Sequence, residues 1–135
     1  MKYLLLLIVF IIVVILSVAG GKERDSPDNP KPFTFCSMIH FIVGVLFALF
    51  TPLTAIQFAI LHIIFELYEN SKFGKNLFKS KTNILYKLSK SIQKITKIDF
   101  WGNDEGYKGD SAINSNMDTL LAVTGFLVAR YGMKK

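Results

Sequence analysis

Apolar residues along this chain are gathered into four long runs that short polar stretches separate. The runs cover about residues 3–19, 33–50, 53–67 and 119–131. Runs of roughly 17–25 apolar residues are typical of helices that cross a membrane. The pattern therefore predicts an all-α integral membrane protein with four transmembrane helices. The segments are a first transmembrane helix or signal anchor at 1–19, a polar linker at 20–32, a transmembrane helical hairpin at 33–70, a basic interfacial segment at 71–109 and a last transmembrane helix at 110–131.

The first run has two interpretations. Lys2, the apolar stretch 4–16 and the small residues 17–19 have the order of a signal peptide with its cleavage site. The same run can instead remain as the first span. Cleavage would leave three spans and place the lysine-rich segment outside, against the tendency of basic loops to lie in the cytoplasm. We therefore expect an uncleaved first span, with loop 71–109 in the cytoplasm.

Lysines dominate the polar part of segment 71–109, with eight of them between residues 72 and 97. Apolar residues recur there at helical spacing, at Ile84, Leu85, Leu88, Ile92, Ile95 and Ile98. This pattern favours an amphipathic helix in the membrane interface over a solvated basic loop. The residues Phe100-Trp101-Gly102 would then form an aromatic anchor at the same interface.

The composition agrees with this class of protein and narrows its partners. Hydrophobic residues make up 51% of the chain, and the formal net charge is +6. No recognisable nucleic-acid-binding module accompanies the positive charge, so we expect membrane lipids, and not nucleic acid, as the partner. Assembly into an oligomer is left open. The single cysteine, Cys36, excludes an intrachain disulfide and a cysteine-based zinc site.

The polar residues inside the runs converge in the predicted topology. The chain leaves along the second run, returns along the third and leaves again along the last. The start of the second run, the end of the third and the start of the last therefore share one half of the bundle. These three places carry eight polar or titratable residues: His40; His62, Glu66, Glu69 and Asn70; Asp110, Asn114 and Asp118.

Three of these residues are the candidates for catalysis and for metal binding. His62 and Glu66 are four residues apart, so a helix places them on one face. Asp118 joins them as a titratable residue inside the last run. Histidine and carboxylate side chains at such spacing can hold a divalent metal ion as cofactor or relay protons. We expect the other five residues to contribute to binding: His40, Glu69, Asn70, Asp110 and Asn114.

Several of these residues also have a structural interpretation. Asp110, which follows Gly109, has the position of a helix N-cap, and Asn114 can form hydrogen bonds between helices. Gly44 and Gly125 would permit close helix packing. Ionisable residues deep in an apolar run favour function, here an enzyme acting on a lipid or polyprenyl headgroup. The alternatives are a non-catalytic protein whose polar cluster locks helix packing, and proton or ion movement.

A family resemblance accompanies these motifs. They are His40-x-x-x-Gly44, Glu66-x-x-Glu69-Asn70-Ser71 and Gly109-Asp110-Ser111-x-x-Asn114-Ser115-x-x-Asp118. Over about residues 36–131 the chain resembles a family of small multi-pass bacterial membrane proteins of unknown function, distantly similar to VanZ-like proteins. The resemblance implies four membrane helices and no particular activity. The lysine-rich stretch 72–99 departs from the family pattern.

Overall fold

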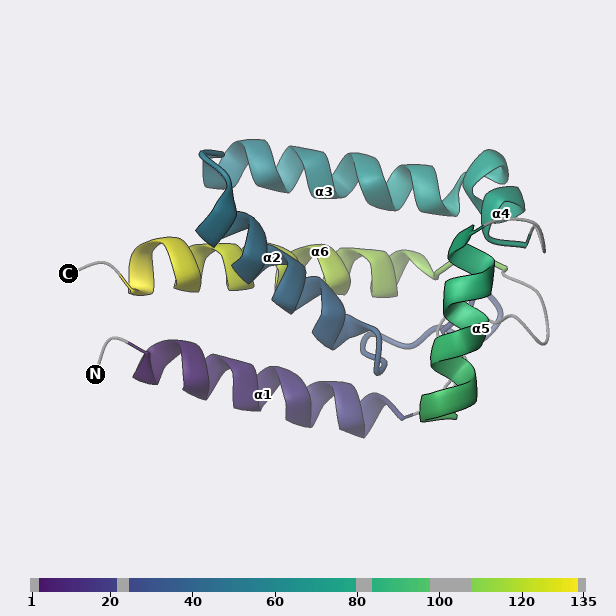
Figure 1. Ribbon diagram of the computed structural model, residues 1–135, viewed down its shortest axis with the longest axis horizontal. Helices are drawn as coiled ribbons and strands as arrows, with labels where there is room; N and C mark the ends of the chain where they lie inside the picture. The colour runs from purple at the N-terminus through teal and green to yellow at the C-terminus, as the bar shows by residue number, and fades with distance from the viewer. Residues whose placement is uncertain (1–2, 22–24, 80–83, 98–107, 134–135) are drawn as a thin grey trace.

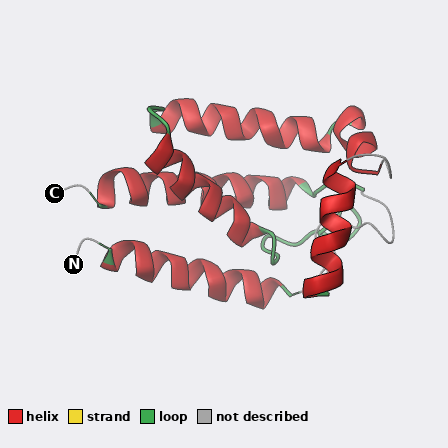
Figure 2. Ribbon diagram, viewed as in Figure 1, coloured by secondary structure: helices red, strands yellow, loops and turns green. Residues whose placement is uncertain are grey.

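The computed structural model describes residues 3–21, 25–79, 84–97 and 108–133, and most of them lie in helices (Figure 2). In chain order these are α1 (Leu4–Gly20), α2 (Ser37–Phe50), α3 (Ala55–Asn70), α4 (Lys72–Lys79), α5 (Ile84–Thr96), α6 (Ala112–Leu127) and the π-helical turn η1 (Val128–Gly132). In the view of Figure 1, α6 lies between α1 and α3, α2 crosses obliquely, and α5 stands across one end. The described part of the chain is thus helical, as its periodicity predicts.

The prediction of four transmembrane helices is wrong. None of the helices in the described ranges is both long enough and apolar enough to cross a membrane. The four helices that fall on the apolar runs have 17, 14, 16 and 16 residues, whereas a hydrocarbon core of ~30 Å needs about 20. Non-helical backbone at 33–36 and 51–54 shortens the runs. The integral-membrane localisation and the cytoplasmic placement of loop 71–109 depend on those spans and are corrected with them.

Two glycines let α2 and α6 cross in close contact. A Cβ atom at Gly44 would overlap the carbonyl oxygen of Ala122, and one at Gly125 would overlap that of Phe41. Glycine is the residue that allows backbones to approach so closely. The close packing predicted for these glycines is confirmed, and it holds the middle of α2 against the C-terminal half of α6.

Helix α3 turns polar residues inward and large apolar residues outward. Thr54 and Gln57 begin the helix with a reciprocal capping box. One stripe at helical spacing is buried, and it consists of Phe58, His62, Glu66 and Glu69. The exposed apolar residues include Ile56, Ile60, Ile64 and Leu67. Charged side chains are seldom buried without a partner, so we expect the buried glutamates of this stripe to have partners on the neighbouring helices.

The apolar core lies toward the opposite end of the same helices. The rings of Phe58 and Phe126 stack there with their centroids 4.9 Å apart, an arrangement that adds about 1 kcal/mol to the effect of burial alone. The buried apolar side chains of this core are Ala48, Phe58, Ala122, Phe126 and Ala129. A second cluster, of Val13, Phe41 and Leu121, joins α1, α2 and α6. This core fixes α3 on α6 and so determines which residues of α6 the polar stripe faces.

Asp25 fastens the polar linker to the start of α6. Its Oδ1 accepts hydrogen bonds from the Lys31 N–H (2.6 Å) and the Ser111 hydroxyl (2.7 Å), and its Oδ2 accepts one from the Ser111 N–H (2.6 Å). The Asn114 side-chain amide adds a bond to the Lys31 carbonyl (3.0 Å). No helix forms between residues 25 and 32, as the prolines there predict. The linker thus positions the helix that carries Asp118.

The basic segment 71–109 differs from the single interfacial helix predicted for it. Two helices, α4 and α5, occupy its described part. Helix α5 does coincide with the apolar periodicity of the sequence, but Ile84, Leu88 and Ile95 on it are exposed. The predicted aromatic anchor at residues 100–102 lies outside the described residues.

Candidate metal centre

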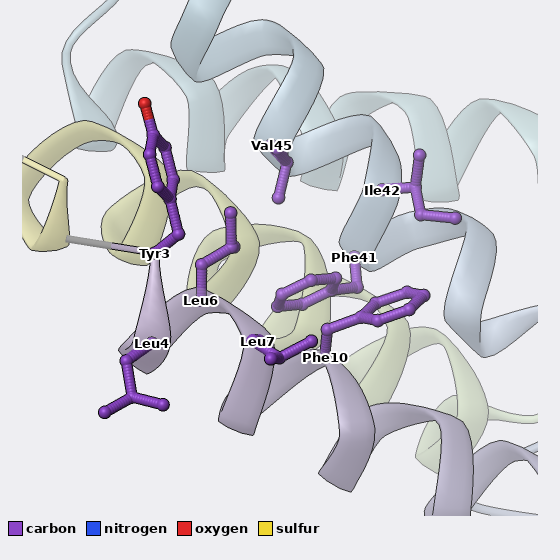
Figure 3. Close-up of a pocket in the computed structure, with 8 residues that line it drawn as sticks. All are labelled: Tyr3, Leu4, Leu6, Leu7, Phe10, Phe41, Ile42 and Val45. Carbon is purple, nitrogen blue, oxygen red and sulfur yellow. The ribbon is translucent and has the colours of Figure 1, made fainter. Parts of the chain in front are cut away.

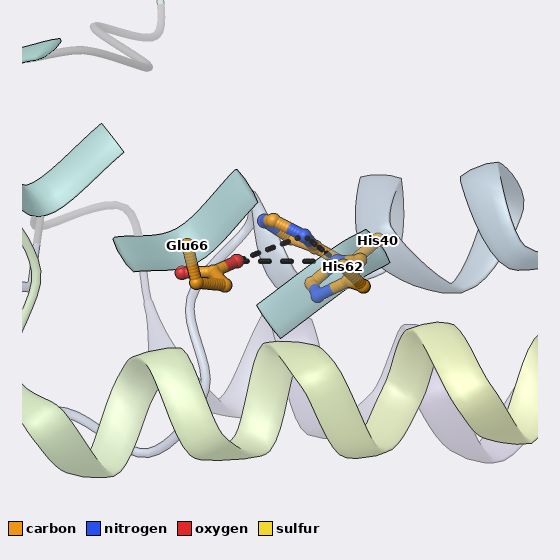
Figure 4. Close-up of side chains that lie close together, drawn as sticks. All are labelled: His40, His62 and Glu66. Carbon is orange, nitrogen blue, oxygen red and sulfur yellow. Dashed lines mark hydrogen bonds and ion pairs between the residues drawn. The ribbon is translucent and has the colours of Figure 1, made fainter. Parts of the chain in front are cut away.

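Two histidines and a glutamate meet where α2 and α3 face α6 (Figure 4). His40 Nδ1 lies 3.0 Å from His62 Nε2 and 3.5 Å from Glu66 Oε1, and His62 Nε2 lies 3.9 Å from that same oxygen. His62 and Glu66 are each 5% exposed, and His40 is partly buried. One potential ligand atom from each side chain therefore faces a common, enclosed space.

The separations of these atoms suit a small divalent cation. Zinc binds histidine nitrogen and carboxylate oxygen at about 2.0–2.2 Å, so its tetrahedral ligands lie about 3.3 Å from one another. The separations of 3.0, 3.5 and 3.9 Å scatter around that value. Two histidines and a glutamate are also one of the ligand sets of catalytic zinc, which keeps a fourth position open.

Each histidine is oriented through its other ring nitrogen by a residue of α6. His40 Nε2 lies 3.2 Å from Asp118 Oδ2, and His62 Nδ1 lies 3.1 Å from Thr119 Oγ1. Hydrogen-bond partners in this position fix the ring and the tautomer of a metal-binding histidine. If the Nε2 proton of His40 is directed at Asp118 and the Nδ1 proton of His62 at Thr119, both facing nitrogens can bind an ion.

Three carboxylate oxygens of this cluster are buried without a hydrogen bond. Within the described residues, neither oxygen of Glu66 nor Oδ1 of Asp118 has a hydrogen-bond partner. Burial raises the pKa of both residues to about 8. The charge of Glu69 adds to the shift for Glu66, while Ser115 beside Glu66 and Ser37 beside Asp118 oppose the shifts in part. Burial also lowers the pKa of His40 to about 3, with a contribution from His62, and lowers the pKa of His62 to about 4. The cluster therefore favours neutral side chains unless a cation offsets the ionised carboxylates.

A hollow of about 420 Å³ gives access to Glu66 from the side of α3 and the start of α6. Ligand pockets usually have volumes of about 300–1,000 Å³, so the hollow can hold a small substrate group. Its polar lining residues are Glu66, Asn70, Asp110, Ser115, Asn116 and Thr119. The centre is thus enclosed on the histidine side and accessible on the carboxylate side.

A second group of carboxylates borders the first. Glu66, Glu69 and Asp110 each offer an oxygen, and these three atoms lie within 4.8 Å of one another. Asn70 connects the two helices that carry them, since its Oδ1 accepts a hydrogen bond from the Asp110 N–H (2.5 Å) and its amide donates one to Ser115 Oγ (3.0 Å). The sequence-predicted binding residues on α3 and before α6 therefore lie side by side.

The structural role considered for Asp110 is wrong. Ser111, one residue later, is the N-cap of α6, and its hydroxyl accepts the Asn114 N–H at 3.2 Å. Asp110 lines the hollow instead. Asn114, in contrast, does not reach the cluster, because its side-chain amide bonds to the carbonyls of Lys31 and Pro32.

The four predicted residues that come together are His40, His62, Glu66 and Asp118, while Glu69, Asn70 and Asp110 border them. Two contributing residues were not anticipated. Thr119 follows Asp118 directly, but a threonine in an apolar run gives no signal of its own. Asp25 is one of several balanced charges in the linker, and only the fold shows that it is buried and bonded to Ser111.

A larger cleft, about 740 Å³, lies between α1 and α2. Figure 3 shows the rings of Phe10 and Phe41 side by side in it, with Leu6 and Val45 nearby. Its lining contains no histidine, carboxylate or lysine. Apart from the Tyr3 hydroxyl its lining is apolar, so it offers no set of ligands for a cation, and the polar cluster is the candidate centre.

Comparison of the chain with protein-family models, with curated proteins and with solved structures found no match. The resemblance to a family of small bacterial membrane proteins therefore stays a prediction.

Proposed function

We propose that this protein is a metal-dependent hydrolase whose divalent ion, of the zinc type, is bound by His40, His62 and Glu66. The observation that carries the proposal is the convergence of one ligand atom from each of these side chains at metal-binding separations. A purely structural cluster would leave the Glu66 oxygens unsatisfied, at about 1–3 kcal/mol or more for each such group. A bound cation removes that penalty.

The chemistry follows from the open side of the centre. A divalent ion acidifies a bound water and stabilises negative charge that develops on a substrate oxygen. The substrate would enter through the hollow beside Glu66. Glu69 and Asp110 are the other carboxylates beside Glu66. With only the histidine-side ion bound, one of them would accept the proton of the attacking water and return it to the leaving group as the scissile bond breaks.

The substrate class that we favour is a phosphate ester, such as the phosphate-bearing headgroup of a lipid or polyprenyl compound. The Lys75 ammonium lies near Asn70, which lines the hollow, because a Cβ at Gly109 would be 3.1 Å from both Lys75 Nζ and Asn70 Oδ1. Carboxylates alone would repel phosphate. A lysine near the hollow and a divalent ion bound beside it would supply the opposite charge that phosphate binding needs.

Zinc content and hydrolysis together test the proposal. Protein dialysed against zinc and then washed should retain a tightly bound ion and should cleave a chromogenic phosphate ester faster than a carboxylic ester. His62→Ala and Glu66→Gln should lose both properties. Asp28→Asn, a change at an exposed linker carboxylate, is the matched control and should keep both. A parent protein that retains no zinc would refute the metal centre.

A packing role is the second candidate, and one contact favours it. The His40–Asp118 pair joins α2 to α6 at 3.2 Å, which would stabilise the helix crossing without any chemistry. Under this alternative, Glu66→Gln and Asp118→Asn lower the free energy of unfolding and the parent shows no metal-dependent activity. Under the hydrolase proposal, variants that remain as stable as the parent still lose activity.

A further inference from the structure

Glu66 faces two sets of potential ligands at once. Figure 4 shows one of its oxygens turned toward His40 and His62 and the other turned away from them. A Glu66 oxygen also lies within 4.8 Å of oxygens of Glu69 and Asp110. We infer that a second divalent cation binds between Glu66, Glu69 and Asp110, so that Glu66 bridges two ions. This inference rests on the proposed function, which places the first ion on the histidine side.

The burial of Glu66 distinguishes this site from an ordinary acidic patch. Its side chain is 5% exposed, and neither oxygen has a hydrogen-bond partner within the described residues. Glu69 is 6% exposed, and Asp110 is partly buried. Carboxylates held this close in a low-dielectric interior repel one another strongly. A divalent ion among them offsets the repulsion and gives the Glu66 oxygen on that side a partner.

The two sites differ in their ligands. The first takes two imidazole nitrogens and one carboxylate oxygen, a set that suits zinc. The second takes carboxylate oxygens only, which suit magnesium and manganese. A carboxylate that gives one oxygen to each ion holds two ions at the separation of about 3.5–4 Å that two-metal hydrolytic centres use.

The second ion would lie on the accessible side of the centre. Glu66 and Asp110 both line the hollow, so an ion between them can contact a substrate there. The hydrogen bond from the Asp110 N–H to Asn70 Oδ1 holds the start of α6 against the end of α3. That bond keeps the third ligand at a fixed distance from the other two.

Manganese is the probe for this site, because it accepts both oxygen and imidazole ligands and is observed directly by electron paramagnetic resonance. Protein stripped with a chelator is dialysed against Mn²⁺, and bound ions are counted. We expect two magnetically coupled ions per chain in the parent and in the control Asp28→Asn. Glu69→Gln and His62→Ala should each keep a single, uncoupled ion. Asp110→Asn, which removes a ligand from another element, should match Glu69→Gln and serves in its place if that variant does not fold.

The counts separate a failure of the second site from a failure of the first. A single ion in the parent that persists in Glu69→Gln and is lost in His62→Ala overturns the second site alone. A single ion that persists in His62→Ala and is lost in Glu69→Gln overturns the histidine centre and the bridge. Two ions without magnetic coupling overturn the bridging role of Glu66. A parent that binds no ion overturns both proposals.

Discussion

His40 and Asp118 are joined at 3.2 Å across the crossing of α2 and α6, through Nε2 of the ring and Oδ2 of the carboxylate. His40 precedes Gly44 by one helical turn, and Asp118 precedes Gly125 by about two. The glycine contacts that set the distance between α2 and α6 therefore also set the distance between histidine and carboxylate. The packing of α2 on α6 therefore also determines how His40, a candidate metal ligand, is oriented.

Asp118→Asn should weaken zinc binding about 10–100-fold, as is typical when the partner of a metal-bound histidine is changed. The amide can still accept a hydrogen bond from His40 but no longer carries the charge that raises the basicity of its ring. Competition with a chromophoric chelator measures the affinity. Asp28→Asn should leave it unchanged. An unaltered affinity in Asp118→Asn would show that the carboxylate does not support the ligand.

Gly44→Ala should lower the free energy of unfolding by about 3 kcal/mol, the upper part of the range for overpacked positions. The added methyl group overlaps the Ala122 carbonyl oxygen, which is backbone and cannot turn away. Gly132→Ala is the matched control, because its Cβ would lie 3.2 Å from the Leu5 side chain and 3.6 Å from that of Val128, both of which can shift. Urea denaturation compares the two. Equal stability would mean that α2 and α6 are not this close.

The sequence predicted correctly that the site residues come together, but not the length of the helices that carry them. Antiparallel connectivity alone indicated that His40, His62, Glu66 and Asp118 would converge, because alternating runs place their near ends together. The membrane spans were overestimated because every apolar residue of a run was counted as helix, whereas the backbone at residues 33–36 and 53–54 is not helical. Apolar composition indicated where helices form but not which of their faces would be buried.

Asp25→Ala should destabilise the fold by about 3 kcal/mol, since hydrogen bonds to a charged acceptor contribute about 1.5–3 kcal/mol each and are not additive. The change leaves the Lys31 N–H and both donors of Ser111 without their acceptor. Asp28→Ala should change stability by less than about 0.5 kcal/mol, as is usual at exposed positions. Thermal or urea unfolding gives the comparison. Similar effects for the two variants would contradict the clamp between linker and α6.

The metal-free protein should lose stability as the pH rises above about 6.5, the ordinary pKa of histidine. Glu66 and Asp118 have pKa values raised to about 8 by burial, whereas carboxyls in the unfolded chain have a pKa of about 4. Their contribution to the free energy of unfolding is therefore complete below pH ~4 and is lost as the pH rises through 8. His40 and His62 have pKa values lowered to about 3 and 4. Their contribution is complete above pH ~6.5 and is lost as the pH falls through those values.

Between about pH 4.5 and 6.5 the free energy of unfolding should not change with pH. In this window the unfolded chain binds two protons on its histidines and the folded chain binds two on its carboxyls, so the numbers are equal. Above that window only the carboxyl contribution changes, and the free energy of unfolding should fall by about 2–3 kcal/mol by pH 8. Saturating zinc should abolish the fall, since the ion takes the place of the protons. Urea titrations at successive pH values, with and without zinc, measure both effects. A metal-free protein whose stability is constant or rises from pH 6.5 to 8 would show that Glu66 and Asp118 are not held neutral by burial.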